Sequence, residues 1–284
     1  MKFSSAKHIK IIMIGAGGTG GHIAPHLYRL LYALDRPVRV IIADGDIVEP
    51  KNLVRQNFIA ADLGRNKAQV LAERYASAFG MEIEYIPEFI ESKTRLANLV
   101  MPTQGFYNRQ LCKYDRELVI LIGAVDNNRS RRLCHSVFKE SDNLVYIDSG
   151  NGEYTGQVVC GIKRSGRMYY KPIGDVYPDV LEITDKFPTQ LSCAEASVSA
   201  PQSIVANVMA ATIVVSYIYN ILVCGEINVR SATFSSKTMT VKPLLTVKRK
   251  RRAIVREKAK LIVSIEEEKN YENTLRTEEH RHAA

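Results

Sequence analysis

The sequence contains no tryptophan and only five cysteines. The cysteines stand singly in the chain, with no C-x-x-C pair, at Cys112, Cys134, Cys160, Cys193 and Cys224. An odd number of isolated cysteines argues against a disulfide framework and against a four-cysteine structural metal site, so we expect no zinc. No signal-peptide pattern precedes the first apolar run, and we therefore expect a reducing, cytoplasmic location.

Length and charge divide the chain into a large domain and a short tail. The 284 residues are 46% hydrophobic and 24% charged, which suits a soluble α/β domain over residues 1–247. The net charge of +9 is concentrated near the C-terminus, where residues 248–284 predict a charged helical tail that begins KRKRR and stays basic through Lys260. The Lys248–Lys260 cluster suits nucleic acid, an acidic protein partner, a membrane surface or simply solvent, and the lack of interleaved aromatic residues weakens specific nucleic-acid binding.

A glycine-rich turn near the N-terminus organises the rest of the chain. The apolar run Ile9–Ile14 predicts a strand, and a helix is expected from Gly21 to about Asp35. Between them lie the glycines Gly15, Gly17, Gly18 and Gly20. Glycines allow close approach of a phosphate to backbone N–H groups at a helix N-terminus. Dehydrogenases, flavoproteins and adenylating enzymes all use this arrangement, so the turn alone indicates only a nucleotide site.

The remaining pattern predicts a Rossmann-like, mostly parallel sheet continued by antiparallel strands. Parallel strands are expected at Val38–Ala43, Ile83–Ile86, Leu118–Gly123 and Leu144–Ser149, with helices at Lys67–Phe79, Thr94–Val100 and Arg129–Phe138. Antiparallel strands are expected at Tyr154–Ile162, Arg167–Tyr170 and Thr233–Leu245, and loops at Met101–Asp115 and Gly174–Thr189. Residues 150–200 would then hold a crossover loop and Cys193.

The apolar segment Gln202–Val223 is long enough to raise the question of a membrane helix. Four polar residues interrupt it, at Asn207, Thr212, Ser216 and Asn220. We expect a buried or dimer-interface helix and no membrane association.

Polar residues that follow the second and fourth strands suit a triphosphate better than a dinucleotide. Asp44 ends the second strand, where an acidic side chain accepts hydrogen bonds from ribose. Further polar residues follow at Asp46, Asn52, Arg55, Gln56 and Lys67. Arginine and lysine bind phosphate oxygens, and a carboxylate such as Asp126 can hold Mg²⁺ at the sheet edge.

These motifs together resemble the ThiF/MoeB superfamily, the adenylating fold shared with ubiquitin-activating enzymes. The resemblance covers about residues 9–247 and includes Gly15-Ala16-Gly17-Gly18-Thr19-Gly20, Asp44-x-Asp46, Asn52-Leu53-x-Arg55-Gln56, Lys67, Asp126-Asn127, Gly156-Gln157-Val158 and Cys193-Ala194-Glu195. The narrower form, without zinc ligands, resembles stand-alone proteins encoded beside ubiquitin-like proteins on bacterial mobile elements, including the PRTRC set.

The resemblance implies an ATP-dependent adenylyltransferase that activates the C-terminal carboxylate of a small ubiquitin-like or sulfur-carrier protein. The glycines would lie under the nucleotide and Asp44 would bind ribose. Asn52, Arg55 and Lys67 would contact phosphates with support from Gln56, while Asp126 would coordinate Mg²⁺ beside Asn127. Cys193 would accept the acyl group or exchange sulfur in a second step. A homodimer is implied, and a conjugating enzyme is a further expected partner if the product is protein tagging.

One feature of the family is missing where it would be expected. The N-terminal helix that sends an arginine into the partner subunit's ATP site has no room before Ile9. A related fragment occurs at Tyr107-Asn108-Arg109-Gln110, which makes Arg109 a remote candidate for that role.

Two other functions remain open from the sequence. A nicotinamide or flavin oxidoreductase would account for the glycine turn and Asp44, but it leaves Asn52, Arg55, Gln56 and Lys67 unexplained. A catalytically inactive ATP-binding scaffold would bind nucleotide without releasing pyrophosphate.

Overall fold

The computed structural model describes residues 1–3, 8–34, 36–103, 105–108, 113–182, 185–190 and 202–246. Residues Met1–Leu245 form one compact unit. The predictions for Arg109, Cys112, Cys193 and the Lys248–Lys260 cluster fall outside the described residues.

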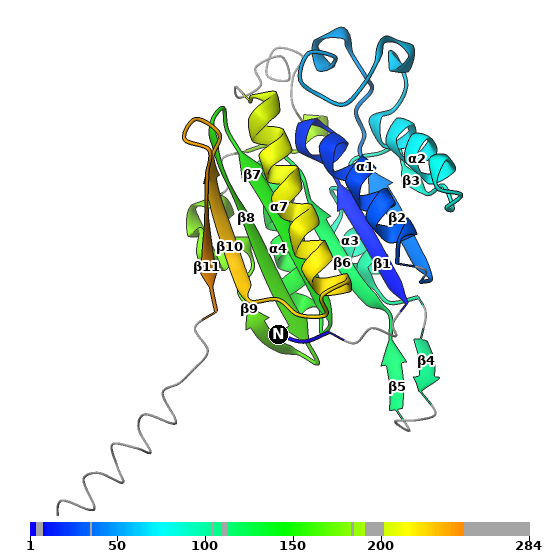
Figure 1. Ribbon diagram of the computed structural model, residues 1–284, viewed down its shortest axis with the longest axis vertical. Coiled ribbons are helices and arrows are strands. Elements are labelled where there is room, and N and C mark those ends of the chain that lie inside the picture. Colours follow the sequence, from blue (N-terminus) through cyan, green and yellow to red (C-terminus); the bar gives the residue numbers. More distant parts are fainter. Residues whose placement is uncertain are drawn as a thin grey trace, which may run out of the picture. The chain divides into compact units, whose positions relative to one another are not determined.

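A mixed sheet forms the centre of this unit (Figure 1), and its strand order is β11-β10-β8-β7-β6-β1-β2-β3, with β9 paired to β8. The parallel strands are β1 (Ile9–Ile14), β2 (Val38–Ala43), β3 (Tyr85–Ile86), β6 (Leu118–Gly123) and β7 (Leu144–Asn151). The antiparallel strands are β8 (Thr155–Arg164), β9 (Arg167–Tyr170), β10 (Val229–Ser235) and β11 (Thr240–Leu245). The predicted fold class is therefore confirmed.

Helices cover both faces of the sheet. α1 (Gly18–Tyr32), α2 (Lys67–Ala78) and α7 (Ile204–Leu222) pack on one face, and α3 (Lys93–Val100), α4 (Asn128–Glu140) and α5 (Ile173–Val176) on the other. Side chains of a strand alternate between faces, so Ile11 and Met13 of β1 join the first core and Ile12 and Ile14 the second. Short 3₁₀ turns lie at Pro50–Asn52, Ala60–Asp62, Pro178–Leu181 and Pro188–Gln190.

Several predicted elements and loops differ from the structure in their bounds or content. Helix α1 begins at Gly18 rather than Gly21, because the low helix propensity of glycine is overridden by packing of the first turn. The predicted loop Met101–Asp115 contains the antiparallel pair β4 (Gly105–Asn108) and β5 (Lys113–Arg116). The predicted loop Gly174–Thr189 includes most of α5 and two 3₁₀ turns.

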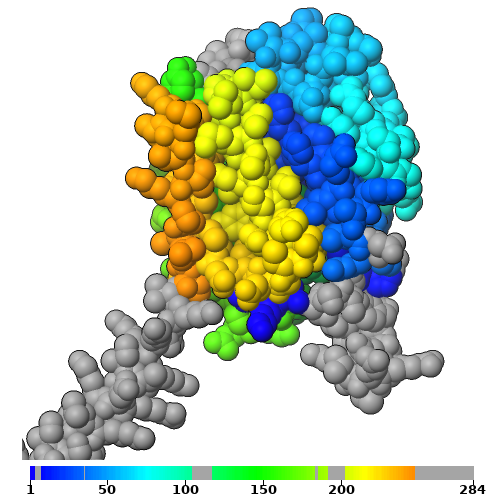
Figure 2. Space-filling model, viewed as in Figure 1, coloured from blue at the N-terminus to red at the C-terminus, as the bar shows by residue number. Residues whose placement is uncertain are grey.

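Among the described residues, α7 is the one helix that is long and apolar enough to span a membrane. Core helices of soluble proteins pass the same test of length and composition. Here α7 lies beside α1 across the sheet (Figures 1 and 2), with Ala210, Val214 and Ile218 buried. One face of α7 is therefore buried, while the other face exposes Ile204, Val208 and Tyr219, and the dimer-interface alternative stays a prediction.

Candidate functional site

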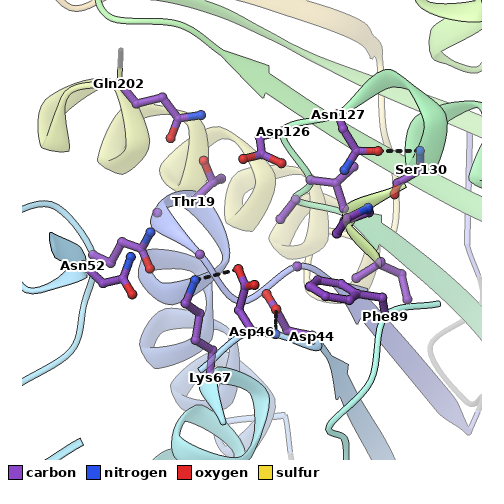
Figure 3. Close-up of a pocket in the computed structure, with 18 of the residues that line it drawn as sticks. Thr19, Asp44, Asp46, Asn52, Lys67, Phe89, Asp126, Asn127, Ser130 and Gln202 are labelled. Atoms are coloured by element: carbon purple, nitrogen blue, oxygen red, sulfur yellow. Dashed lines mark hydrogen bonds and ion pairs between the residues drawn. The ribbon is translucent and has the colours of Figure 1, made fainter. Parts of the chain in front are cut away.

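A cavity of about 370 Å³ opens at the carboxyl ends of β1, β2, β6 and β7 (Figure 3). Strand β1 lies between β2 and β6, and the chain continues from β1 to β2 on one side and from β6 to β7 on the other. This reversal is the position where open α/β sheets bind ligands, because the loops on the two sides separate there. The volume falls in the range of small-molecule sites.

The glycine turn forms the floor of the cavity. Gly15 has a φ of +99°, and a Cβ there would lie 2.4 Å from the carbonyl oxygen of Ala124. A Cβ on Gly20 would lie 2.1 Å from the carbonyl oxygen of Gly15, so this glycine allows α1 to close onto the turn. Gly17 caps α1 without a side-chain hydrogen bond, which leaves the first N–H groups of the helix available to an anion.

Asp44 connects the end of β2 to the glycine turn. Its Oδ2 accepts a 2.6 Å hydrogen bond from the Ala16 N–H, and its Oδ1 accepts one of 2.9 Å from the Asp46 N–H. Burial raises the pKa of Asp44 to about 6, with a further increase from the charge of Asp46 and an opposing effect of Lys67. Each oxygen keeps a second lone pair, so the carboxylate can still accept a hydroxyl from the cavity.

Lys67 provides a nearly buried cation on the α2 side of the cavity. Its Nζ lies 2.8 Å from Asp46 Oδ2, and its backbone N–H donates to the Asp46 carbonyl at 2.9 Å. The preceding Asn66 caps α2 through its Oδ1 and donates from Nδ2 to the Asp44 carbonyl at 2.8 Å. The start of α2 is therefore fixed to the acidic strand end, and Lys67 is fixed with it (Figure 3).

The 3₁₀ turn Pro50–Asn52 and the segment after it present Asn52, Arg55 and Gln56 to the same space. The Oδ1 of Asn52 accepts from the Glu49 N–H at 2.8 Å, which holds the turn. Arg55 donates from Nη1 to Gln202 Oε1 at 3.0 Å, so the segment that leads into α7 contacts the segment that follows the 3₁₀ turn. The Oε1 of Gln56 is buried and accepts no hydrogen bond from the described residues.

Asp126 and Asn127 follow β6 on the opposite side of the cavity (Figure 3). Asn127 caps α4 by accepting the Ser130 N–H at 2.8 Å, and Asp126 is exposed to the cavity. Within the described parts of the chain, no cluster of three or more His, Cys, Asp or Glu side chains could hold a metal. A single carboxylate nevertheless suits Mg²⁺, which takes its remaining ligands from phosphate oxygens and water.

Arg131 fastens the strand ends behind Asp126. Its Nη2 donates to the Val125 carbonyl at 2.6 Å and to the Ser149 carbonyl at 3.3 Å, so it bridges β6 and β7. Its Nε lies 3.3 Å from the fully buried Asp148, whose Oδ2 accepts the Tyr146 hydroxyl at 2.6 Å. Although Arg131 lines the cavity, its N–H groups therefore mainly bond the strand ends that form the cavity wall.

Residues 185–190 form part of the rim. Asp185 accepts the Asn128 N–H at 2.6 Å, and Thr189 donates from its hydroxyl to Glu91 at 2.6 Å. The Phe187 ring packs 4.8 Å from the Arg129 guanidinium carbon. The intervening Lys186 and Pro188 line the cavity.

The cavity brings together nearly all of the residues predicted for the site. The predicted residues that line it are Gly15, Gly17, Gly18, Asp44, Asp46, Asn52, Arg55, Gln56, Lys67, Asp126 and Asn127. Gly20 lies beneath the turn, and Cys193 lies outside the described residues. Sequence reasoning gave no separate role to Thr19, although the glycine motif contains it, and it missed Phe89, Asn151, Lys186 and Gln202, which carry no recognisable motif. All five residues line the cavity.

Comparison with known proteins gives a family and a fold. A family model described as the ThiF family matches residues 3–255. Selenomethionine PaaA aligns with a TM-score of 0.57 at 19% identity, over 85% of this chain and 65% of that one. E. coli MccB with AMPCPP and selenomethionine MccA aligns with a TM-score of 0.55 at 16% identity, over 85% of this chain and 65% of that one. E. coli MccB with ATP aligns with a TM-score of 0.53 at 18% identity, over 85% of this chain and 64% of that one. The chain thus spans about 65% of these structures, and no curated protein matches it.

Proposed function

Because the chain belongs to the ThiF family, we propose that it is an ATP-dependent adenylyltransferase acting on the C-terminal carboxylate of a small protein. One observation carries the proposal. A helix N-terminus without a side-chain cap, two basic side chains and a separate carboxylate line the same cavity, as Gly17, Arg55, Lys67 and Asp126. The ATP present in a structure of E. coli MccB supports the choice of nucleotide.

The proposed reaction forms an acyl-adenylate. An oxygen of the substrate carboxylate attacks the α-phosphorus of ATP. The bond between that phosphorus and the oxygen that bridges the α- and β-phosphates breaks, and pyrophosphate leaves with the bridging oxygen. The chain needs no nucleophile for this step, since positioning and charge neutralisation supply the catalysis. Arg55 and Lys67 would neutralise the phosphates, the N–H groups of α1 would hold them in place, and Asp44 would bind the ribose.

Asp126 would hold Mg²⁺ together with oxygens of the nucleotide. The ion would supply charge neutralisation on the departing pyrophosphate. Asp126 faces the cavity from the side opposite Lys67 (Figure 3), so the Asp126 carboxylate and the Lys67 ammonium do not pair with one another.

The substrate class in this proposal is a ubiquitin-like or sulfur-carrier protein. MccA in the MccB structures supports a polypeptide substrate for this fold. Exposed apolar side chains lie close in sequence to residues that line the cavity: Val54 (82% exposed) and Ile59 (60%) flank Arg55 and Gln56, and Val205 (54%) follows Gln202. We assign these three side chains to a homodimer interface. Light scattering should give a dimer mass that falls to the monomer in Val54→Asp, and a monomeric wild type would refute the assignment.

A second step is proposed at Cys193, whose thiolate would attack the adenylate carbonyl and release AMP. Two of the described cysteines are poor alternatives. Cys134 and Cys160 are fully buried, and burial raises the pKa of both thiols, to about 12 for Cys134. Cys224 is exposed and serves as the matched control. A thioester seen on non-reducing gels should vanish in Cys193→Ser and persist in Cys224→Ser.

Exchange of labelled pyrophosphate into ATP, dependent on the carrier protein, tests the first step. Arg55→Ala and Asp126→Ala should each lower the exchange rate by roughly 10²–10³, because the first removes a positive charge that faces the developing pyrophosphate and the second removes the carboxylate that would hold Mg²⁺. Arg95→Ala is the control, because Arg95 pairs with Glu88 on the surface and does not line the cavity. Full exchange in the Arg55 and Asp126 variants would overturn the proposal.

A further inference from the structure

Helix α7 buries one carboxamide, that of Asn207, which is 0% exposed. The hydroxyls of Thr212 and Ser216 on the same helix are exposed and donate to carbonyls one turn back, at 2.9 and 2.7 Å. Burying an amide in an apolar helix costs free energy unless the amide is hydrogen-bonded. The partners of Asn207 therefore indicate why the helix carries it.

Those partners lie at the nucleotide cavity. The Oδ1 of Asn207 accepts from Asn151 Nδ2 at 2.9 Å. The Thr19 hydroxyl lies 3.0 Å from Asn151 Oδ1 and 3.5 Å from Asn207 Oδ1. Thr19 belongs to the first turn of α1 and Asn151 ends β7, and both line the cavity. One side chain of α7 thus joins the start of α1 to the end of β7.

The same amide also stands against the bare backbone of Gly18. A Cβ built on Gly18 would lie 2.3 Å from Asn207 Nδ2, so any side chain at position 18 would clash with Asn207 of α7. The Nδ2 group is buried and donates no hydrogen bond within the described part of the chain. Asn207 therefore fills the space that glycine leaves open at position 18 and limits how the first turn of α1 can lie.

We infer that Asn207 is a positioning residue for the triphosphate, which holds the first turn of α1 so that its N–H groups face the phosphates. The inference rests on the proposed function, since it requires ATP in this cavity. Asn207 itself lies beneath the turn, outside the lining of the cavity, and acts through Gly18 and Thr19. It connects α7, from the last third of the chain, to the motif at the start.

Binding of ATP and of adenosine separates this role from a general contribution to folding. Asn207→Asp keeps the shape but adds a negative charge beside the first turn of α1, which should weaken ATP binding by roughly tenfold or more. Adenosine has no phosphate, so its dissociation constant should change by less than about twofold. Asn220→Ala, near the other end of α7, is the control and should bind both ligands like the wild type.

Titration calorimetry of both ligands gives distinct outcomes. Unchanged ATP binding by Asn207→Asp, or equal weakening of ATP and adenosine, would overturn the inference. A wild type that binds no ATP would instead overturn the proposed function and the inference with it. If Asn207→Asp does not fold, a double-mutant cycle decides. Gly18→Ala should weaken ATP binding, and adding Asn207→Ala should restore part of it by freeing space. Strictly additive losses would refute the contact.

Discussion

The two ends of the parallel strands both bury charged side chains, but they use them differently. At the amino end, Lys10 of β1 donates from Nζ to the Met101 carbonyl at 3.0 Å. Glu117, just before β6, accepts from both the N–H and the hydroxyl of Thr103, at 2.9 and 3.2 Å. These groups are enclosed, with Lys10 1% and Glu117 5% exposed, and each side chain has a hydrogen-bond partner within the fold.

At the carboxyl end, the polar groups are only partly satisfied by the fold. Buried side-chain atoms that lack a hydrogen-bond partner among the described residues include Gln56 Oε1, Ser149 Oγ and Asn207 Nδ2. Burial raises the pKa of Asp44 to about 6, a cost that no fully compensating cation offsets. Such groups are costly for stability alone, and the contrast indicates that this end of the sheet is arranged for a ligand.

The largest expected effect is a loss of pyrophosphate exchange in Lys67→Met, for which Lys10→Met is the matched control. Both lysines are nearly buried, and methionine keeps most of the stem volume. Lys67→Met should lower carrier-dependent pyrophosphate exchange by roughly 10²–10³, because it removes the positive charge that we propose faces the phosphates of ATP. Lys10→Met should leave exchange unchanged at a temperature where the variant is folded. Equal losses of activity in the two variants would remove the distinction between the ends.

A second prediction concerns the pH dependence of stability at the carboxyl end. The pKa of Asp44 is about 6 in the folded chain and 3.8 ordinarily, so the folded state binds a proton more tightly. The free energy of unfolding should therefore fall as pH rises from about 4 to 6, by about 3 kcal/mol from this group. Urea titrations at several pH values measure it.

Asn at position 44 removes the titrating group and serves as the comparison. Asp44→Asn should be less stable than the wild type at every pH, since an amide cannot accept from both the Ala16 and Asp46 N–H groups. Its stability should nevertheless depend less on pH between about 4 and 6. The same slope in both proteins would show that another group, such as the buried Asp148, is responsible.

The parallel half of the fold could be predicted because its strands are short apolar runs that end in glycine or aspartate. Ile9–Ile14 and Leu118–Gly123 were assigned correctly for this reason. The pair β4 and β5 was missed because its sequence, with Gly105 and Lys113, has no apolar alternation. Helix α1 starts early because Asn207 and the carbonyl of Gly15 pack against its glycines, which no local pattern reveals.

The site was predictable where one motif placed several side chains close in sequence. Arg55 and Lys67 lie within a short stretch after β2, and the fold brings that stretch to the glycine turn. Gln202 and Asn207 reach the same place from far along the chain, through packing of α7 on α1. Their contribution depends on tertiary contacts, so the sequence marks Asn207 only as a polar interruption of an apolar helix and carries no signal for Gln202.

The smallest expected effect lies at the amino end, where Lys10→Met should change stability alone. The substitution leaves the Met101 carbonyl without its donor and Glu117 without the positive charge that lies near it. Burial also lowers the pKa of Lys10, so part of the loss is recovered when the costly buried ammonium is removed. We expect a net loss of about 1–2 kcal/mol in the free energy of unfolding.

Adding Glu117→Gln to Lys10→Met should recover part of this loss, because glutamine leaves no unpaired negative charge at the amino end. Chemical denaturation without ATP measures this recovery, and the same titration with ATP measures how much the nucleotide stabilises each variant. The stabilisation by ATP should be the same in the wild type, in Lys10→Met and in the double variant. At a given ATP concentration it equals RT ln(1 + [L]/Kd), so it changes only if the dissociation constant of ATP at the cavity changes. A smaller stabilisation in either variant would mean that the two ends of β1 are coupled through the strand, and the amino end would then belong to the nucleotide site.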